Sequence, residues 1–163
     1  MLPSFIHLVI WGHEHESISE LVENSENGFY LYQPGSSTIT SLIEAEAKPK
    51  HAGLLEIKAG EFTHKPIFLE RARPLLFKSI ELKELFDIGS QDAFKNKDPS
   101  KQEAWVAKQL ETQIEEMILE YSKRPKASTM LPIVRLKIEY TGFDILRVGN
   151  IEAKFQGKVA NEG

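Results

Sequence analysis

The segment with the clearest potential for chemistry is Gly12-His13-Glu14-His15-Glu16, close to the N-terminus. It follows directly on the apolar run from Phe5 to Trp11. Neutral imidazole is the commonest metal ligand, and α/β folds collect their ligands at the carboxyl ends of strands. The pattern therefore predicts that His13 and His15 bind a metal ion. An exposed polar loop is the alternative for so short a motif.

Two imidazoles do not complete a hydrolytic metal centre, which needs roughly three or more protein ligands. The other histidines, His7, His51 and His64, lie in strand-like or loop segments without metal-ligand spacing, so we assign them no role. A self-contained metallohydrolase that recruits Glu14 or Glu16 is therefore disfavoured. We assign no catalytic residue.

The elements that position this loop begin with residues 5–11, whose bulky and β-branched side chains predict a strand buried on both faces, at the centre of a sheet. Two further strands are expected over 17–23 and 29–32. The turn at 33–37 either joins strands or brings amides and hydroxyls near a phosphate. A buried strand needs more neighbours than these, so we expect the sequence to be the C-terminal part of a larger domain.

The rest of the chain predicts a hairpin over 52–58 and 61–70, strands over 75–82 and 132–140, and a long helix over 101–123. Ser100 and Glu103 have capping-box spacing at the expected start of the helix. One face of the helix is apolar, through Trp105, Leu110, Ile114, Met117, Ile118 and Tyr121. The fold class is therefore α+β, and residues 38–46 stay unassigned.

Composition narrows the classes of partner. The 163 residues include 24 acidic and 20 basic side chains and carry a net charge of -4, so nucleic acid would need a local basic patch. The absence of cysteine rules out disulfides and thiolate metal sites and suits an intracellular protein. No apolar run approaches the roughly 20 residues that cross a membrane, and no glycine-rich phosphate loop is present.

Two motifs in order, residues 8–16 (LVIWGHEHE) and 33–37 (QPGSS) followed by 40–42 (TSL), resemble the meiotic recombination eleven family of repair nucleases. The likeness continues through 49–51, 53–57, 73–74, 114–117, 131–136, 140–143, 154–155 and 157–161, nearly the whole chain. Family members commonly carry aspartate where His7 stands and cysteine where Ser17 stands.

This resemblance implies a calcineurin-like metallophosphoesterase with two manganese ions, and His13 and His15 would each bind a different ion. The family's other metal-ligand motifs lie upstream of this sequence, so whether the chain is itself an enzyme stays open. Residues 1–46 would be the end of the phosphoesterase sheet. Residues 47–163 would be the small α/β DNA-binding capping domain with its long helix.

The expected activity of the intact protein is manganese-dependent endonuclease and 3'-5' exonuclease cleavage in DNA double-strand-break repair, including meiotic homologous recombination. The implied partners are DNA, a coiled-coil ATPase of the structural-maintenance type, a nibrin-type subunit and a second copy of the chain, in the nucleus and without a membrane. The DNA-binding candidates are Lys50, Arg73, Arg135, Lys137 and Arg147. A solvated basic face is the alternative explanation for alternating charges of this kind. For the chain as a whole, the alternative is a DNA-binding or protein-interaction module without catalysis.

Overall fold

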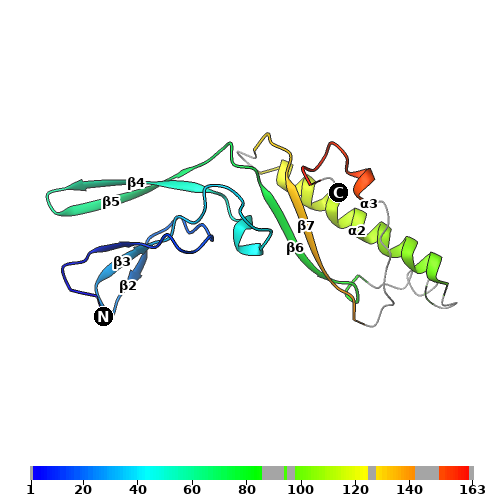
Figure 1. Ribbon diagram of the computed structural model, residues 1–163, viewed down its shortest axis with the longest axis horizontal. Coiled ribbons are helices and arrows are strands. Elements are labelled where there is room, and N and C mark those ends of the chain that lie inside the picture. Colours follow the sequence, from blue (N-terminus) through cyan, green and yellow to red (C-terminus); the bar gives the residue numbers. More distant parts are fainter. Residues whose placement is uncertain (1, 86–93, 95–97, 125–127, 142–150, 162–163) are drawn as a thin grey trace. The chain divides into compact units, whose positions relative to one another are not determined.

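The computed structural model describes residues 2–85, 94, 98–124, 128–141 and 151–161. They form two compact units (Figure 1), one of residues 1–75 with 128–130 and one from the described parts of 76–127 and 131–163. Short sheets and one long helix confirm the α+β class, whereas the calcineurin-like sheet stays a prediction. The predicted domain boundary at residues 46 and 47 also stays a prediction; the compact units divide after Leu75.

The first unit contains a three-stranded sheet in the order β1-β3-β2. Its strands are β1 (Leu8–Ile10), β2 (Val22–Asn24) and β3 (Phe29–Tyr32). β1 runs parallel to β3, and β2 is antiparallel to it. The turn between β2 and β3 places Gly28 at φ +70°. The strand expected over 29–32 is confirmed, whereas the one expected over 17–23 is observed only over Val22–Asn24.

The strand predicted to be central and buried is short and lies at the edge of this sheet. β1 pairs with β3 alone among the described residues. Ile10 is 62% exposed and Phe5 is 77% exposed. The prediction of burial on both faces is wrong for these residues, because the apolar run has more surface to bury than the described segments cover.

Directly after this sheet come the 3-10 helix η1 (Glu44–Ala47) and a hairpin of β4 (His51–Lys58) and β5 (Glu61–Phe68). All eight residues of each hairpin strand are paired, as expected. The hairpin faces β3 through ring contacts of Tyr30 with Phe62 and of Tyr32 with His64, with centroids 5.7 and 4.3 Å apart. Gly53 permits this packing, because a Cβ there would lie 2.6 Å from the Tyr32 hydroxyl.

In the second unit, a two-stranded sheet packs against the long helix. The elements are β6 (Leu75–Glu81), α2 (Pro99–Ser122), β7 (Ile133–Glu139) and α3 (Ile151–Lys154). The core is built from both strands and both helices, and its buried members are Ile80, Leu82, Val106, Leu110, Ile151, Phe155 and Val159. No helix in the described part of the chain is long and apolar enough to cross a membrane.

Helix α2 begins two residues earlier than expected. Its N-cap is Asp98, whose carboxylate accepts a 3.0 Å hydrogen bond from the amide of Ser100, and Pro99 occupies the first turn. The expected cap at Ser100 is therefore wrong, because proline is well suited to the first helical position and moves the cap one residue before itself. The buried face also includes Val106 and Gln113, which the apolar pattern had not singled out.

We predict that Leu110→Ala lowers the free energy of unfolding of the second unit by about 2–5 kcal/mol, because Leu110 is 3% exposed and its removal leaves a cavity. Leu119 is the matched control, since it lies on the same helix and is 54% exposed. Leu119→Ala should change stability by less than about 0.5 kcal/mol. Urea denaturation followed by circular dichroism measures both, and equal losses would contradict the assigned core.

Candidate functional site

The loop that carries His13 and His15 follows the carboxyl end of β1, beside the carboxyl end of the parallel strand β3. A 2.8 Å hydrogen bond from the Trp11 amide to the Tyr32 carbonyl continues the pairing up to the loop. His13 is exposed, and its ring meets the edge of Trp11 with centroids 6.4 Å apart. The side chain of His15 is 52% exposed. Both imidazoles are therefore at the sheet edge that the sequence predicted.

The turn at residues 33–37 holds the backbone of this loop. The amide of Ser36 donates to the carbonyl of His15 at 3.2 Å, and the Gln33 side-chain amide donates to the carbonyl of Glu16 at 3.2 Å. Gly35 has φ +69°, and a Cβ there would lie 2.7 Å from both carbonyl oxygens. The contacts therefore favour a structural turn over a phosphate contact for this segment.

The side chain with the most hydrogen bonds in the site is Glu46 of η1, which no sequence pattern singled out. This carboxylate is 1% exposed and accepts hydrogen bonds from five side chains and two backbone amides. The side-chain donors are His15, Ser36, Thr40, Ser41 and Lys50. The spacing of Glu46 and Lys50, four residues apart, was the one signal in the sequence.

Burial alone would raise the pKa of the Glu46 carboxyl, because it penalises the charged form. Hydrogen bonds from the side chain and amide of Thr40, from Lys50 and from His15 more than offset burial, so the pKa lies well below its ordinary value. Glu46 is therefore ionised at neutral pH and acts only as an acceptor.

Lys50 is buried, with its side chain 3% exposed and its ammonium 3.1 Å from Glu46 and 3.0 Å from the Ser36 hydroxyl. A lysine that neutralises a buried carboxylate is not placed to meet a DNA phosphate. Lys50 is therefore buried away from a DNA phosphate, and in this structure it balances the charge of Glu46.

The two histidines fit part of a metal coordination shell. The Nδ1 atom of His15 is engaged by Glu46 and Thr40, which leaves Nε2 as the nitrogen that can bind a metal ion. Imidazoles that bind metals usually donate their other N–H to a carboxylate in this way. Within the described residues, no group of three or more His, Asp or Glu side chains is arranged to hold a metal ion. His13 and His15 could thus supply two ligands of a larger set.

A second polar cluster in the same unit does not join the metal-site candidates. His51 is 3% exposed, and its Nδ1 lies 2.6 Å from the Ser17 hydroxyl. Burial, assisted by the nearby His64, lowers the pKa of His51 against the opposing charge of Glu20. The Tyr32 hydroxyl and the Nε2 atoms of His51 and His64 are buried without a hydrogen-bond partner. His51 therefore packs in the interior of its unit.

Two of the other DNA-binding candidates lie on strand β7 of the second unit. Arg135 and Lys137 are exposed, whereas Val134, Leu136 and Ile138 pack against the core, so alternate residues point away from helix α2. The Arg135 guanidinium lies over the ring of Phe77, 6.0 Å from its centroid. Arg73 is partly buried in the first unit, and Arg147 lies outside the described residues.

Comparison with known proteins gives one family and several relatives. Residues 62–163 match the family model described as the Mre11 DNA-binding presumed domain. Double-strand break repair protein MRE11 of Oryza sativa subsp. japonica is 39% identical over 163 residues, and that of Homo sapiens is 39% identical over 165. Each alignment covers 98% of this chain and 22% of the relative, so the chain spans about a fifth of their length. Double-strand break repair protein mus-23 of Neurospora crassa is 36% identical, covering 99% of this chain and 23% of its own length.

We predict that Gly35→Ala destabilises the first unit more than Gly28→Ala. Both glycines have φ near +70°, a conformation that costs alanine about 1–2 kcal/mol. Only at Gly35 does the added Cβ meet backbone atoms, at 2.7 Å, which adds about 1–3 kcal/mol of overpacking. Gly28 has open space around it. Urea denaturation of both variants measures the difference, and equal losses would contradict the close approach of the turn to the histidine loop.

The lowered pKa of Glu46 predicts a pH dependence of folding. Because the folded-state pKa lies below the unfolded value of about 4.5, the stabilising effect is complete above that pH. It is lost as pH falls from there toward the folded pKa, since the unfolded chain then takes up the proton first.

Stability measured by denaturation between pH 6 and pH 3 should therefore fall less steeply in Glu46→Gln than in the unmodified chain. Glu44→Gln is the control, because Glu44 is exposed in the same short helix. It should keep the steep slope. The same slope in all three proteins would show that Glu46 does not carry the effect.

Proposed function

This chain belongs to the Mre11 family of DNA-binding domains through residues 62–163, and we propose that it is part of a manganese-dependent nuclease that repairs DNA double-strand breaks. The observation that carries the proposal is that the chain combines this DNA-binding domain with a histidine pair at the carboxyl end of a strand, one ring of which is held by a buried carboxylate. The named repair proteins among its relatives support the same function.

In this proposal His13 and His15 are the last ligands of a two-manganese site, each for a different ion. When bound, manganese would act as a Lewis acid toward the phosphodiester group. The turn at 33–37 holds the backbone of the loop that carries both imidazoles, and Glu46 orients the ring of His15. Further ligands would come from other segments of the intact protein, so we expect this chain by itself to be inactive.

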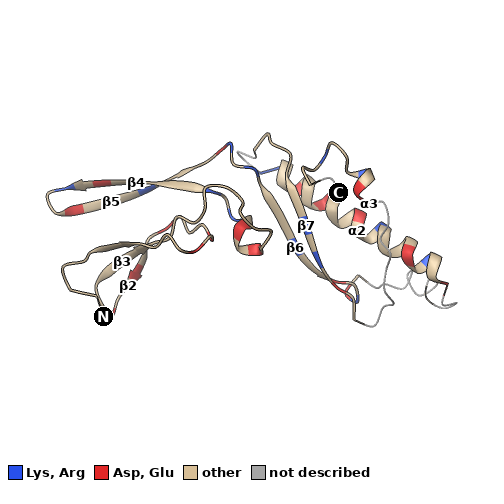
Figure 2. Cartoon of the chain, viewed as in Figure 1, with Lys and Arg blue, Asp and Glu red and all other residues tan. Residues whose placement is uncertain are grey.

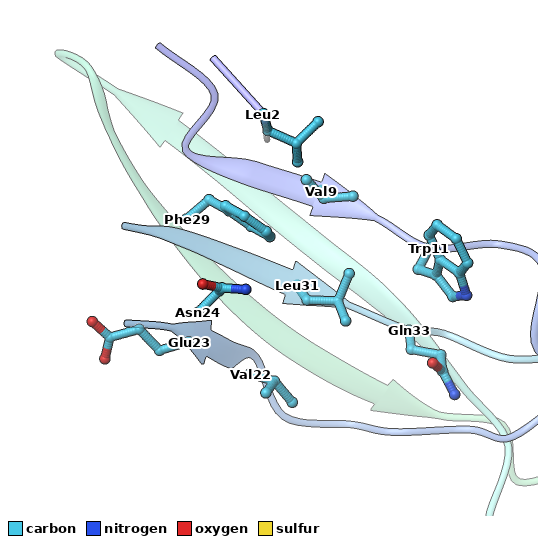
Figure 3. Close-up of a pocket in the computed structure, with 9 residues that line it drawn as sticks. All are labelled: Leu2, Val9, Trp11, Val22, Glu23, Asn24, Phe29, Leu31 and Gln33. Atoms are coloured by element: carbon cyan, nitrogen blue, oxygen red, sulfur yellow. The ribbon is translucent and has the colours of Figure 1, made fainter. Parts of the chain in front are cut away.

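We further propose that β1, β2 and β3 are the end of a calcineurin-like phosphoesterase sheet. One face of these strands packs on the β4–β5 hairpin, and the other bears an apolar pocket of about 390 Å³ (Figure 3). The pocket is lined by Leu2, Val9, Trp11, Val22, Glu23, Asn24, Phe29, Leu31 and Gln33. An open apolar face beside β1, which pairs on one side only among the described residues, supports further strands and packing segments in the intact protein.

DNA contact is proposed for the outer face of β7. Arg135 and Lys137 project from the middle of that strand, and basic positions are visible on it in Figure 2. The outer face of the β6–β7 sheet also carries two acidic side chains, Glu81 and Glu139, which lie at the ends of the strands. Contacts to the phosphate backbone carry no sequence information, and nothing in the described residues indicates base-specific readout, so recognition would be of backbone and shape. Arg73 and Arg147 stay as further candidates.

The remaining expectations also belong to the intact protein. Because the relatives are named double-strand break repair proteins, we propose that it works in the nucleus, with roles in homologous recombination and meiosis. Its proposed partners are a coiled-coil ATPase of the structural-maintenance type, a nibrin-type subunit and a second copy of itself.

A second candidate function is a DNA-binding module without catalysis. The specific observation in its favour is that the matched family model begins at residue 62, after the histidine loop, and is described as DNA-binding alone. Both candidates predict DNA binding. They differ in whether His13 and His15 bind manganese.

We predict that the chain retains duplex DNA in a salt-sensitive manner and that Arg135→Ala and Lys137→Ala each weaken retention on all sequences. Loss of one phosphate contact should reduce the slope of log affinity against log salt by about 1. Lys108→Ala is the matched control, because Lys108 is exposed on α2, which packs on the opposite face of the sheet. Fluorescence anisotropy at several salt concentrations measures the slopes. Equal slopes for all three variants would contradict DNA contact at β7.

A further inference from the structure

The carboxylate of Glu46 determines which nitrogen of His15 carries a proton. The Nδ1 atom of His15 lies 3.1 Å from Glu46 Oε1 and also contacts the Thr40 hydroxyl. Both oxygens of Glu46 accept from groups that can only donate, namely the amides of Thr40 and Ser41 and the Lys50 ammonium, as an ionised carboxylate does. Such a carboxylate only accepts hydrogen bonds, so Nδ1 must be the donor in the first contact. The neutral ring therefore carries its proton on Nδ1 and has a lone pair on Nε2.

The contact with Thr40 leads to the same tautomer. The Thr40 hydroxyl also makes a hydrogen bond to Glu46 Oε1, and its single proton must be used there because the carboxylate has none to give. The hydroxyl oxygen can then only accept from His15. With Glu46 ionised, both partners thus require Nδ1–H, and both contact the same ring nitrogen.

Glu46 is itself held in place from several sides. The Ser36 hydroxyl and the Lys50 ammonium bind Oε2 at 3.0 and 3.1 Å, and the amide of Ser41 binds Oε1 at 3.0 Å. A carboxylate with this many fixed donors has little freedom to turn. The orientation of the His15 ring is consequently set by the interior of the unit, although the ring itself is half exposed.

No comparable partner orients His13 among the described residues. Its ring meets the edge of Trp11, and neither of its nitrogens donates a hydrogen bond to a carboxylate of the described residues. The two imidazoles of the loop therefore differ: His15 is held in one tautomer before any ligand arrives, and His13 is not. This difference makes His13 an internal control for the effect of Glu46.

We propose that Glu46 is a positioning residue for metal binding: it fixes His15 in the Nδ1–H tautomer and presents Nε2 as a preformed metal ligand. The inference rests on the proposed function, in which His15 binds manganese. Carboxylates in this position raise the basicity of the histidine and its affinity for the metal. Ser36, Thr40 and Lys50 support Glu46 and act on the metal only through it.

The first test needs no substitution and no metal. Long-range ¹H–¹⁵N correlation spectra of the full chain at neutral pH report which ring nitrogen of each histidine is protonated. We expect His15 as the Nδ1–H tautomer and His13 as a mixture of both tautomers. A His15 ring protonated on Nε2 would overturn the proposal, whatever the chain does with metals.

The second test uses Glu46→Gln, with Glu44→Gln as the matched control on the same short helix. We expect Glu46→Gln to return His15 to a mixture of tautomers and to leave His13 unchanged, and Glu44→Gln to change neither. A purely structural role for Glu46 would lower stability without this selective effect. If Glu46→Gln does not fold, the tautomers of the unmodified chain still decide the first point.

The third test adds manganese alone to the chain and follows paramagnetic broadening of the histidine signals. We expect broadening at His15 at lower manganese concentrations in the unmodified chain than in Glu46→Gln, by about 10- to 100-fold. Broadening that is equal in both proteins would overturn the positioning role while leaving His15 as a ligand. A His15 ring that is Nδ1–H but never broadened would instead overturn the metal site of the proposed function, and the positioning proposal with it.

Discussion

A carboxylate removed from water must be surrounded by donors, and this requirement at Glu46 organises the first unit around the histidine loop. Its hydrogen bonds come from four segments that are separate in the sequence: the loop itself, the turn at 33–37, the Thr40-Ser41 stretch and Lys50 just before β4. All four segments lie outside the helices and strands. Their conformation is therefore set by satisfying one buried charge, and the half-exposed ring of His15 inherits its orientation from that arrangement.

Local sequence patterns predicted the regular elements of the structure but not the buried polar cluster. The β4–β5 hairpin and helix α2 follow from local periodicity and turn residues, and both were expected within a few residues of their observed bounds. Glu46 could not be found in this way, because it lies in a stretch without clear periodicity, where nothing indicates that a glutamate is buried. Lys50 was misjudged for the same reason, since a lysine is ordinarily exposed and its buried partner was unknown.

For the apolar run Phe5–Trp11 the sequence predicted more burial than the structure shows. Its composition predicts a central, buried strand, and the described residues cover only part of its surface. A local apolar pattern reflects the burial of a segment in the intact fold, whereas the described residues of this chain bury only part of that segment's surface. The apolar pocket beside Val9 and Leu31 is part of the surface that the described residues leave uncovered. The phosphoesterase sheet is therefore proposed, whereas the α+β class is observed.

The two compact units divide the proposed activity between them, with the histidine pair in the first and the basic strand β7 in the second. The central claim is that this chain contains part of a nuclease site and not a complete one. The most direct measurement is manganese-dependent cleavage of a labelled duplex oligonucleotide by the purified chain, with His13→Ala beside it. We predict no cleavage by either protein under conditions in which the duplex is retained. Cleavage by the unmodified chain that disappears in His13→Ala would contradict this claim, because the site would then be complete within these residues.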